Sequence, residues 1–230
     1  MLLPSVHGGI SVISDLTLDI TSSASEQNIL TLATAAGYNA ATDDTAIIVN
    51  IASGVTISGS STHALRTGAL NADSDLTINV ASGAAITGFT GANGGTGAAG
   101  SAGGDGILFE ISSGTGTYLV DNDGTISGGG GGGGGGGTAG SRQYLYNDGK
   151  YEYCVGWATS AGSAGSAGSA GSLGQAGSAG SAGSLPGGSC PVVTSPGSGG
   201  AGGAAGKAVN YGGLTVSTTG SAGTFNGATS

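Results

Sequence analysis

The stretch GFTGANGGTGAAGSAGGDG, residues 88–106, carries glycine at every third position without a miss. The same spacing returns in an unbroken glycine run over residues 128–137, extended in register to Gly140, and again over residues 162–183 and 197–206. A period of three fits neither the α-helix, which repeats near 3.6 residues, nor the strand, which repeats near 2. It matches the left-handed extended helix of three residues per turn, in which every third residue lies on one edge.

Glycine along one edge of such a helix lets a second backbone approach closely, as at the axis of collagen. The four blocks contain no interior proline, which argues against collagen itself and leaves every residue its N–H donor. Because this helix has no internal hydrogen bonds, buried backbones must bond sideways to neighbours. We therefore predict an all-β fold plus polyglycine II helices: a laterally hydrogen-bonded bundle of left-handed, three-residue-per-turn helices, with no α-helix.

The alternative for these blocks is a set of flexible Gly/Ser/Ala linkers. Glycine-rich sequence without a period is typical of disorder. The unbroken phase over residues 88–106 and 162–183 favours the ordered bundle.

The segment before the first glycine block reads as β structure. Apolar and polar residues alternate over residues 10–13 and 16–20, and residues 29–32 predict a further short strand. Segments 48–59 and 77–88 resemble each other, and 118–128 is a looser copy; each has the form strand, turn with glycine, strand, glycine. Such copies predict a stacked β-arch, β-helix-like base, and two of them run directly into glycine blocks.

These patterns predict three parts of the chain. Residues 1–87 form a β-rich base, residues 88–206 form the polyglycine-helix bundle with an inserted β-arch (107–127) and a tyrosine-rich loop (141–161), and residues 207–230 add closing C-terminal strands. If the four blocks alternate in direction, connections 107–127 and 184–196 lie at one end of the bundle and 141–161 at the other.

The stretch YLYNDGKYEY, residues 144–153, predicts a β-hairpin, because an Asn-Asp-Gly turn is flanked by alternating residues. The alternation puts four aromatic rings on one face if the turn keeps register: Tyr144, Tyr146, Tyr151 and Tyr153. The hairpin either packs over the glycine bundle or forms an aromatic patch that binds a sugar or a protein loop.

Composition excludes several classes of function. The formal charge is −9 with only four Lys and Arg, so we expect no nucleic-acid binding, which needs clustered cations. No apolar run approaches the roughly 18 residues of a membrane span. The first nine residues lack the features of a secretory signal, so this low-charge, surface-like composition fits a virion component released by lysis, or a piece of a longer polypeptide.

The two cysteines, Cys154 and Cys190, can form one disulfide or remain two free thiols. Neither has a histidine nearby, so their spacing matches no metal motif, and alternating blocks would place them far apart. The chain also lacks a serine nucleophile elbow and a phosphate-binding loop. We expect no enzyme activity, no metal and no cofactor.

Residues 50–57, 64–70 and 76–80, with the glycine tract 128–137 that follows residues 122–126, resemble the distal region of bacteriophage central tail-fibre (host-specificity) proteins. The closing residues 208–212 are similar to the ends of those proteins. A related likeness is to tail-fibre tip adhesins of myophages, whose glycine-rich motifs form a polyglycine helix sandwich that displays variable receptor loops. The resemblance implies a virion tail-tip location, other tail-fibre or tail-tip proteins as partners, and a homotrimer.

We therefore predict a non-enzymatic tail-fibre tip adhesin that binds a host surface receptor, either an outer-membrane protein or a polysaccharide. The predicted receptor-binding residues are Tyr144, Tyr146, Lys150, Tyr151, Tyr153 and Trp157. Two alternatives are an ice-binding protein with flat arrays of small side chains, against which the tyrosine hairpin argues, and a structural glycine-rich cell-surface repeat protein.

Overall fold

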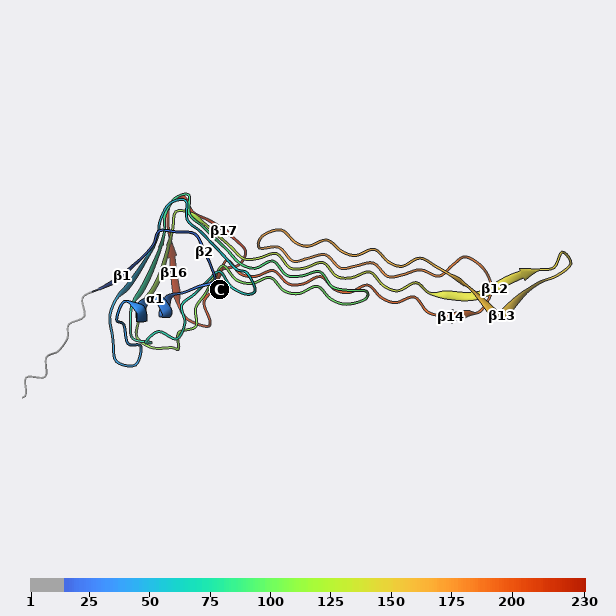
Figure 1. Ribbon diagram of the computed structural model, residues 1–230, viewed down its shortest axis with the longest axis horizontal. Coiled ribbons are helices and arrows are strands. Elements are labelled where there is room, and N and C mark those ends of the chain that lie inside the picture. Colours follow the sequence, from blue (N-terminus) through green and yellow to red (C-terminus); the bar gives the residue numbers. More distant parts are fainter. Residues whose placement is uncertain (1–14) are drawn as a thin grey trace, which may run out of the picture.

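Parallel strands from successive turns of the chain build a three-sided base, from which a long rod projects (Figure 1). The computed structural model describes residues 15–230. The strand predicted over residues 10–13 and the segment tested for a secretory signal lie outside these described residues. The structure is mostly β, as predicted, and the sheets of its base are parallel.

Three parallel sheets form the base, and each turn of the chain adds strands to them in the same order. The first sheet contains, in spatial order, β1 (Leu16–Ile20), β4 (Ile47–Ile51), β7 (Leu76–Val80), β10 (Tyr118–Asn122) and β16 (Val216–Thr219). The second contains β2 (Ala24–Ser25), β5 (Thr56–Ser58), β8 (Ala85–Thr87), β11 (Thr125–Ser127) and β17 (Thr224–Asn226). The third contains β3 (Gln27–Asn28), β6 (Leu65–Arg66), β9 (Ile107–Leu108) and β15 (Val209–Asn210).

The hydrophobic core lies inside this three-sided coil. Side chains alternate between core and solvent along the strands, and the register stacks equivalent residues on one another: Val49 pairs with Ile78, and Ile78 with Val120. All three are fully buried. Burying an apolar side chain of this size stabilises a fold by about 1.5–3 kcal/mol, so these stacks hold the turns of the coil together.

A short helix, α1 (Ile29–Ala35), stands where we predicted a strand over residues 29–32, and the prediction of no α-helix is therefore wrong. The Asn28 side chain accepts a hydrogen bond from the Thr31 N–H at 3.2 Å and so caps the helix. Ile29 and Ala33, four residues apart, are both buried on one face of it. Among the described residues, no helix is long and apolar enough to cross a membrane.

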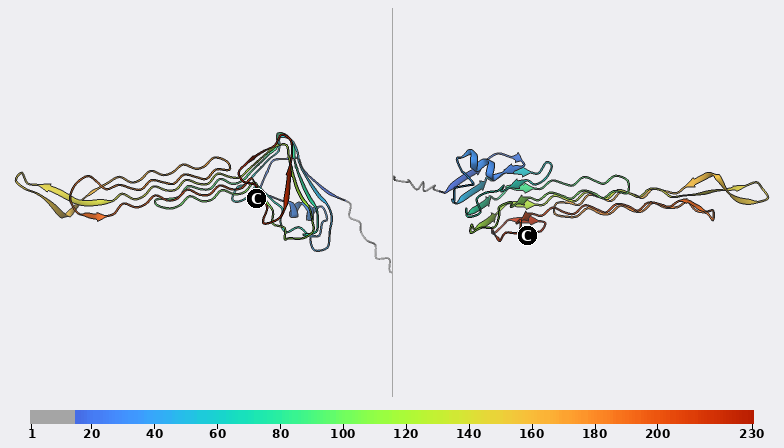
Figure 2. Two further views of the ribbon diagram at one scale, coloured as in Figure 1. Left: turned by 180° about the vertical axis from the view of Figure 1, so that it is seen from behind. Right: turned by 90° about the horizontal axis from the view of Figure 1, so that it is seen from below.

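Two excursions leave the base between its second and third sheets. The first, residues 88–106, joins β8 to β9, and the second, residues 128–208, joins β11 to β15. Figure 2 shows both running side by side along the rod. The base therefore continues through strands β9, β10 and β11 between the two excursions.

The glycine blocks form six segments instead of four, because two blocks reverse in their middle. Residues 88–106 turn back at Gly97, where Ala98 N–H donates to Gly95 O, and residues 162–184 turn back at Gly174, where Gln175 N–H donates to Ser172 O. Both Gly97 and Gly174 have φ of +69°, a conformation that favours glycine. Connections 141–161 and 184–196 consequently lie at the same far end of the rod, contrary to the predicted topology.

The run Gly128–Gly137 is the central segment of the rod. Its neighbours donate to it or accept from it on successive edges: Gly91 N–H bonds to Gly130 O, Gly171 N–H to Gly131 O, and Gly203 N–H to Gly132 O, each at 2.7–2.8 Å. Segment 98–106 accepts from the N–H groups of Gly129, Gly132 and Gly135, and segment 175–184 accepts from those of Gly131, Gly134 and Gly137. Because all its edges face other backbones, every position in this run must be glycine, whereas the outer segments need glycine only at the positions that face another backbone.

Candidate functional site

The far end of the rod is a three-stranded antiparallel sheet in the order β13 (Glu152–Ala161), β12 (Ser141–Asn147), β14 (Val192–Thr194). β12 and β13 form the predicted hairpin, with Tyr146 opposite Tyr153 and Tyr144 opposite Val155. The ladder is interrupted between Gln143 and Tyr144, where the register shifts and residues 156–158 of β13 have no partner on β12; we call this interruption the bulge. The hairpin projects beyond the other segments and forms the tip of the molecule (Figure 1).

Side-chain hydrogen bonds fix the turn of the hairpin. Asp148 Oδ1 accepts from the N–H groups of Lys150 and Tyr151 at 2.9 and 2.8 Å, and Gly149 N–H donates to Asn147 Oδ1 at 2.8 Å. Donation from Tyr151 and Lys150 holds the pKa of Asp148 below its ordinary value. Gly149 has φ of +85°, which this turn requires. The turn is a pre-organised loop whose geometry Asp148 and Asn147 dictate.

The tyrosines of the hairpin are exposed to solvent, from 38% for Tyr146 to 71% for Tyr151. Tyr144, Tyr146 and Tyr153 share one face by their pairing, and the rings of Tyr146 and Tyr153 lie 5.4 Å apart between centroids. Tyr151 lies in the turn, one residue before β13, so it is outside the paired ladder.

Two other predicted site residues lie on the same hairpin. Lys150 is exposed in the turn. Trp157 lies within β13, but its side chain is outside the described part of the structure. The hairpin therefore places five of the six predicted residues in exposed positions at the tip, and the sixth, Trp157, lies on its strand β13.

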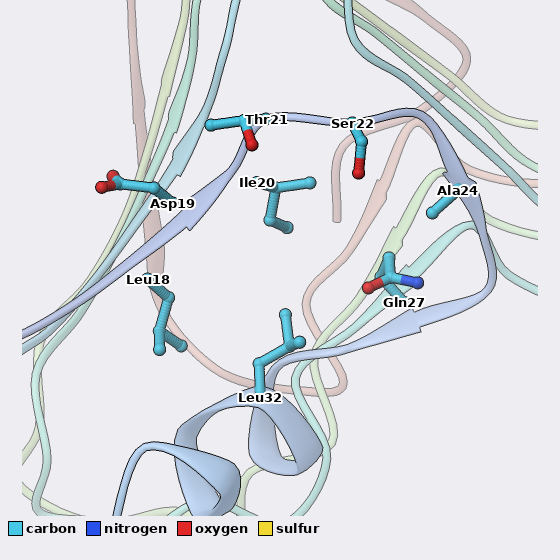
Figure 3. A pocket seen from close by; sticks show the side chains of 8 residues that line it. All are labelled: Leu18, Asp19, Ile20, Thr21, Ser22, Ala24, Gln27 and Leu32. Carbon is cyan, nitrogen blue, oxygen red and sulfur yellow. The ribbon is translucent and has the colours of Figure 1, made fainter.

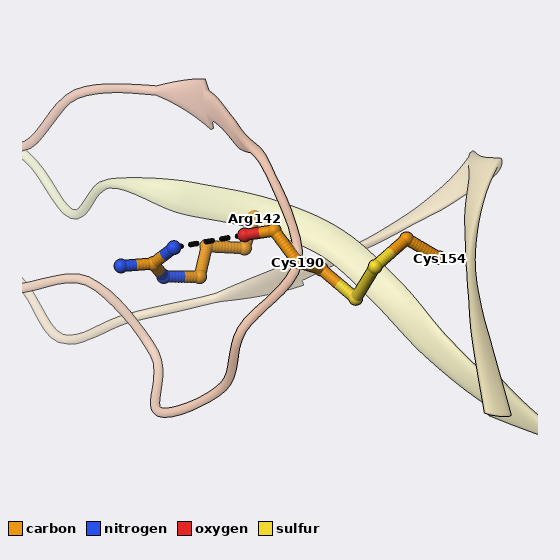
Figure 4. Close-up of a disulfide and its surroundings, with 3 residues drawn as sticks. All are labelled: Arg142, Cys154 and Cys190. Atoms are coloured by element: carbon orange, nitrogen blue, oxygen red, sulfur yellow. Dashed lines mark hydrogen bonds between the residues drawn. A yellow bond between two sulfur atoms is a disulfide. The ribbon is translucent and has the colours of Figure 1, made fainter.

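The connection 185–196 packs against the start of this hairpin. Gln143 N–H donates to Pro191 O at 2.9 Å, and Arg142 Nη1 donates to Cys190 O at 2.8 Å. A disulfide joins Cys190 to Cys154 of β13 (Figure 4). Cys154 pairs with Leu145, so it occupies the face of the hairpin opposite to that of Tyr146 and Tyr153. The loop is thus fastened behind the tyrosine face.

A hollow of about 230 Å³ opens between the hairpin and this loop, lined by Arg142, Gln143, Tyr144, Leu145, Ser160, Gly187, Gly188 and Cys190. Within the described residues, Arg142 Nε is a buried side-chain nitrogen without a hydrogen-bond partner. We did not predict Arg142 as part of the tip. The available signal was its place two residues after the last in-phase glycine, Gly140, where the chain leaves the rod.

A second hollow, of about 250 Å³, lies at the opposite end of the molecule (Figure 3). Leu18 and Ile20 of β1 and Leu32 of α1 supply its apolar wall, and Asp19 and Gln27 supply polar groups. Strands β1, β2 and β3 are edge strands of their three sheets. At this end, the edge strands of the three sheets therefore present backbone N–H and C=O groups around an apolar hollow. Over residues 15–230, no three His, Cys, Asp or Glu side chains cluster as metal ligands would.

Comparison with known proteins decides the class of this molecule. The family model described as phage tail fibre adhesin Gp38 matches residues 15–229. The chain belongs to this adhesin family. The adhesin is a component of the phage tail fibre at the virion tail tip.

A solved structure shows the same fold as the adhesin. The crystal structure of the gp37-gp38 adhesin tip complex of the bacteriophage S16 long tail fiber matches with a TM-score of 0.54 and 20% identity. The match covers 94% of the adhesin and 82% of the S16 chain. A comparison with curated proteins gives no match.

Proposed function

We propose that the distal hairpin of the adhesin binds a receptor on the host cell surface through Tyr144, Tyr146, Lys150, Tyr151, Tyr153 and Trp157. The observation that carries this proposal is the set of exposed tyrosines at the end of a long rod. Tyrosine gives large contact area at low conformational cost, and exposed aromatic clusters are unusual on a surface that has no partner. The receptor is an outer-membrane protein or a surface polysaccharide.

The test replaces the four exposed tyrosines, Tyr144, Tyr146, Tyr151 and Tyr153, with alanine in phage that carry the adhesin. A matched control is Leu173→Ala, because Leu173 is also an exposed apolar residue but lies in the turn at Gly174, whose N–H donates to Gly128 O where the rod leaves the base. The tyrosine variant should adsorb to host cells at least roughly tenfold more slowly, the loss expected for about 1.4 kcal/mol of contact energy. Unchanged adsorption with an intact rod would remove the hairpin from the receptor site.

We further propose that the six glycine segments are polyglycine II helices and that the base is a stack of β-arches. In this division the residues up to 87 form the base, residues 88–206 form the bundle around an inserted β-arch (107–127) that joins the base, and residues 207–230 add the closing strands. The lateral bonds support this, since donors recur at every third residue, as in Gly165, Gly168 and Gly171. A rigid rod of this kind would hold the hairpin far from the base, where a receptor can be reached.

The base is proposed to attach the adhesin to another tail-fibre protein. The three sheet edges β1, β2 and β3, with the hollow they surround, support docking of a partner, because unpaired edges accept strands from other chains. A homotrimer stays a prediction. The core of the described residues closes within one chain, so trimerisation is not needed to bury it, and light scattering on the purified protein measures the stoichiometry.

The adhesin is proposed to act by binding, without catalysis. Family membership favours this role over the two alternatives, ice binding and a structural surface repeat. A thermal-hysteresis assay and a whole-cell binding assay on the purified protein separate the three directly.

A further inference from the structure

The disulfide Cys154–Cys190 attaches the loop 185–196 to the hairpin closer to the tip than the loop's hydrogen bonds to β12 do, within the described part of the chain. The bonds from Pro191 O and Cys190 O reach Gln143 and Arg142, at the start of β12, and β14 pairs with β12 at Ser141 and Arg142. The disulfide instead reaches β13 at Cys154, opposite Leu145. It therefore lies one residue from the Tyr146–Tyr153 pair along both strands.

A discontinuity in the hairpin lies between these two levels of attachment. The bulge between Gln143 and Tyr144 breaks the ladder, because residues 156–158 of β13 are not paired with β12 there. The hydrogen bonds from the loop lie on the rod side of the bulge, and the disulfide lies on the tip side. Within the described residues, the disulfide is thus the bond that ties the tip half of the hairpin to the loop and stops it pivoting at the bulge.

The two cysteine residues differ in exposure to solvent. Cys190 is 2% exposed, whereas Cys154 lies in an exposed part of β13. A small thiol or disulfide in solution therefore reacts with Cys154 first. Cys190 lies close to it and is the resolving cysteine, which attacks the mixed disulfide formed at Cys154. This arrangement suits reversible thiol–disulfide exchange, which needs one accessible sulfur and one close partner.

A tail-fibre protein is made inside the infected cell, where glutathione and thioredoxin keep thiols reduced, and it works outside, where disulfides persist. We propose that Cys154–Cys190 is a redox lock on the receptor-binding tip: it is open during assembly and closes after release, fixing the tyrosine face for receptor capture. This inference rests on the proposed function of the hairpin.

The chemistry of closure balances with a low-molecular-weight disulfide from the medium as oxidant. The Cys154 thiolate attacks one sulfur of that molecule, forms a mixed disulfide and releases one small thiol. The Cys190 thiolate then attacks Cys154 Sγ, which closes the protein disulfide and releases the second small thiol. The two protein thiols lose two protons and two electrons, and the small disulfide gains both.

Adsorption of phage with and without the closed lock tests the first half of the proposal. Phage carrying the adhesin are reduced, alkylated with iodoacetamide and compared with untreated phage. We expect adsorption to fall at least roughly tenfold, as when the binding-competent conformation drops to about a tenth of the population. Phage carrying the double variant Cys154→Ser, Cys190→Ser should adsorb at this lower rate before and after reduction. Reduced wild-type phage that adsorb at the full rate would overturn the lock.

Two further measurements separate the possible failures. Hydrogen exchange on residues 128–137 should be the same before and after reduction; a loss of protection there would mean that reduction unfolds the rod, which contradicts a lock confined to the tip. If the receptor assignment is wrong, the result is different: oxidised phage in which the four hairpin tyrosines are replaced by alanine would adsorb at the full rate.

The timing is tested by trapping thiols in infected cells. Cells are quenched in acid before lysis and labelled with a maleimide polymer that shifts the protein on a gel. Two labels per adhesin in the cells and none in released virions are expected. A disulfide already complete before lysis would contradict closure after release.

Discussion

Gly131 lies directly against Gly203: a Cβ atom added to Gly131 would stand 2.0 Å from the carbonyl oxygen of Gly203. A Cβ atom added to Gly132 would stand 1.9 Å from Ala92 O, and one added to Gly133 would stand 2.2 Å from Gly168 O. Three successive residues of the central segment thus meet three different backbones, and no side chain fits at any of them.

The first prediction follows for Gly131→Ala. The added methyl group must push a backbone aside, so the variant should lose about 1–3 kcal/mol of unfolding free energy, or more. The matched control is Gly95→Ala, since a Cβ at Gly95 meets no atom within 4 Å. Thermal unfolding of the two variants measures the difference. Equal melting temperatures would contradict the close packing of the central run.

The second prediction concerns the phase of the glycine spacing. Deleting residues 170–172 together with 175–177 shortens the hairpin around Gly174 by one turn on each side and keeps every glycine in phase. Deleting Ala167 alone puts the glycines on either side of the gap out of phase. The six-residue deletion should fold and support adsorption, whereas the single deletion should unfold the segment, because side chains would replace glycine against the central run. Circular dichroism compares the two, and a well-folded single deletion would argue against the three-residue repeat.

The third prediction tests the register of the base. Ile78 is fully buried between Val49 and Val120, whereas Ile48 on the neighbouring strand points away from the core. Ile78→Ala should cost about 2–5 kcal/mol, because it leaves a cavity in the stack. Ile48→Ala should cost well under half as much. Chemical denaturation measures both, and equal costs would contradict the inward and outward faces described for these strands.

The fourth prediction concerns Glu26, whose side chain binds the loop 59–63 and whose own backbone has a φ of +50°. Its Oε1 accepts from Ser61 N–H at 2.6 Å, Ser61 Oγ–H at 2.8 Å and Thr62 N–H at 3.1 Å. These bonds, the Ser61 hydroxyl first, lower the pKa of Glu26 from 4.5 to about 2. A lowered pKa stabilises the folded state above pH 4.5, and this stabilisation is lost as pH falls towards 2.

Glu26→Gln should therefore be less stable than the wild type at neutral pH, and the two proteins should converge near pH 2. Acid unfolding followed by circular dichroism at several pH values measures the gap. A gap that stays constant from pH 7 to pH 2 would mean that the charge on Glu26 contributes nothing.

Part of this molecule could be predicted from its sequence. Alternation in residues 16–20 and the copies at 48–59 and 77–88 predict β-strands in repeated units, since the core residues Val49 and Ile78 recur at equal positions. The likeness of these copies to tail-fibre proteins predicts the adhesin family. The hairpin of Tyr146 and Tyr153 follows from one turn signal and one alternation.

Other features could not be predicted, for physical reasons. The turns at Gly97 and Gly174 reverse the chain without interrupting the three-residue glycine spacing. The spacing therefore does not show where the chain changes direction. The cap of α1 was visible as Asn28 before Ile29 and Ala33, but seven residues are too few to stand out from a strand pattern. The contact between Arg142 and Cys190 depends on the reversals, so it could not be foreseen without them.

The most direct test of the rod is hydrogen exchange at single-residue resolution over residues 128–137. The amides of Gly129, Gly131, Gly132, Gly134, Gly135 and Gly137 donate to neighbouring segments. We predict that they exchange at least roughly a thousandfold more slowly than in an unstructured peptide, as expected for bonds that open only with the rod. Exchange of these six amides at unstructured-peptide rates would contradict the account, because the rod would then be a flexible linker that cannot hold the tip in place.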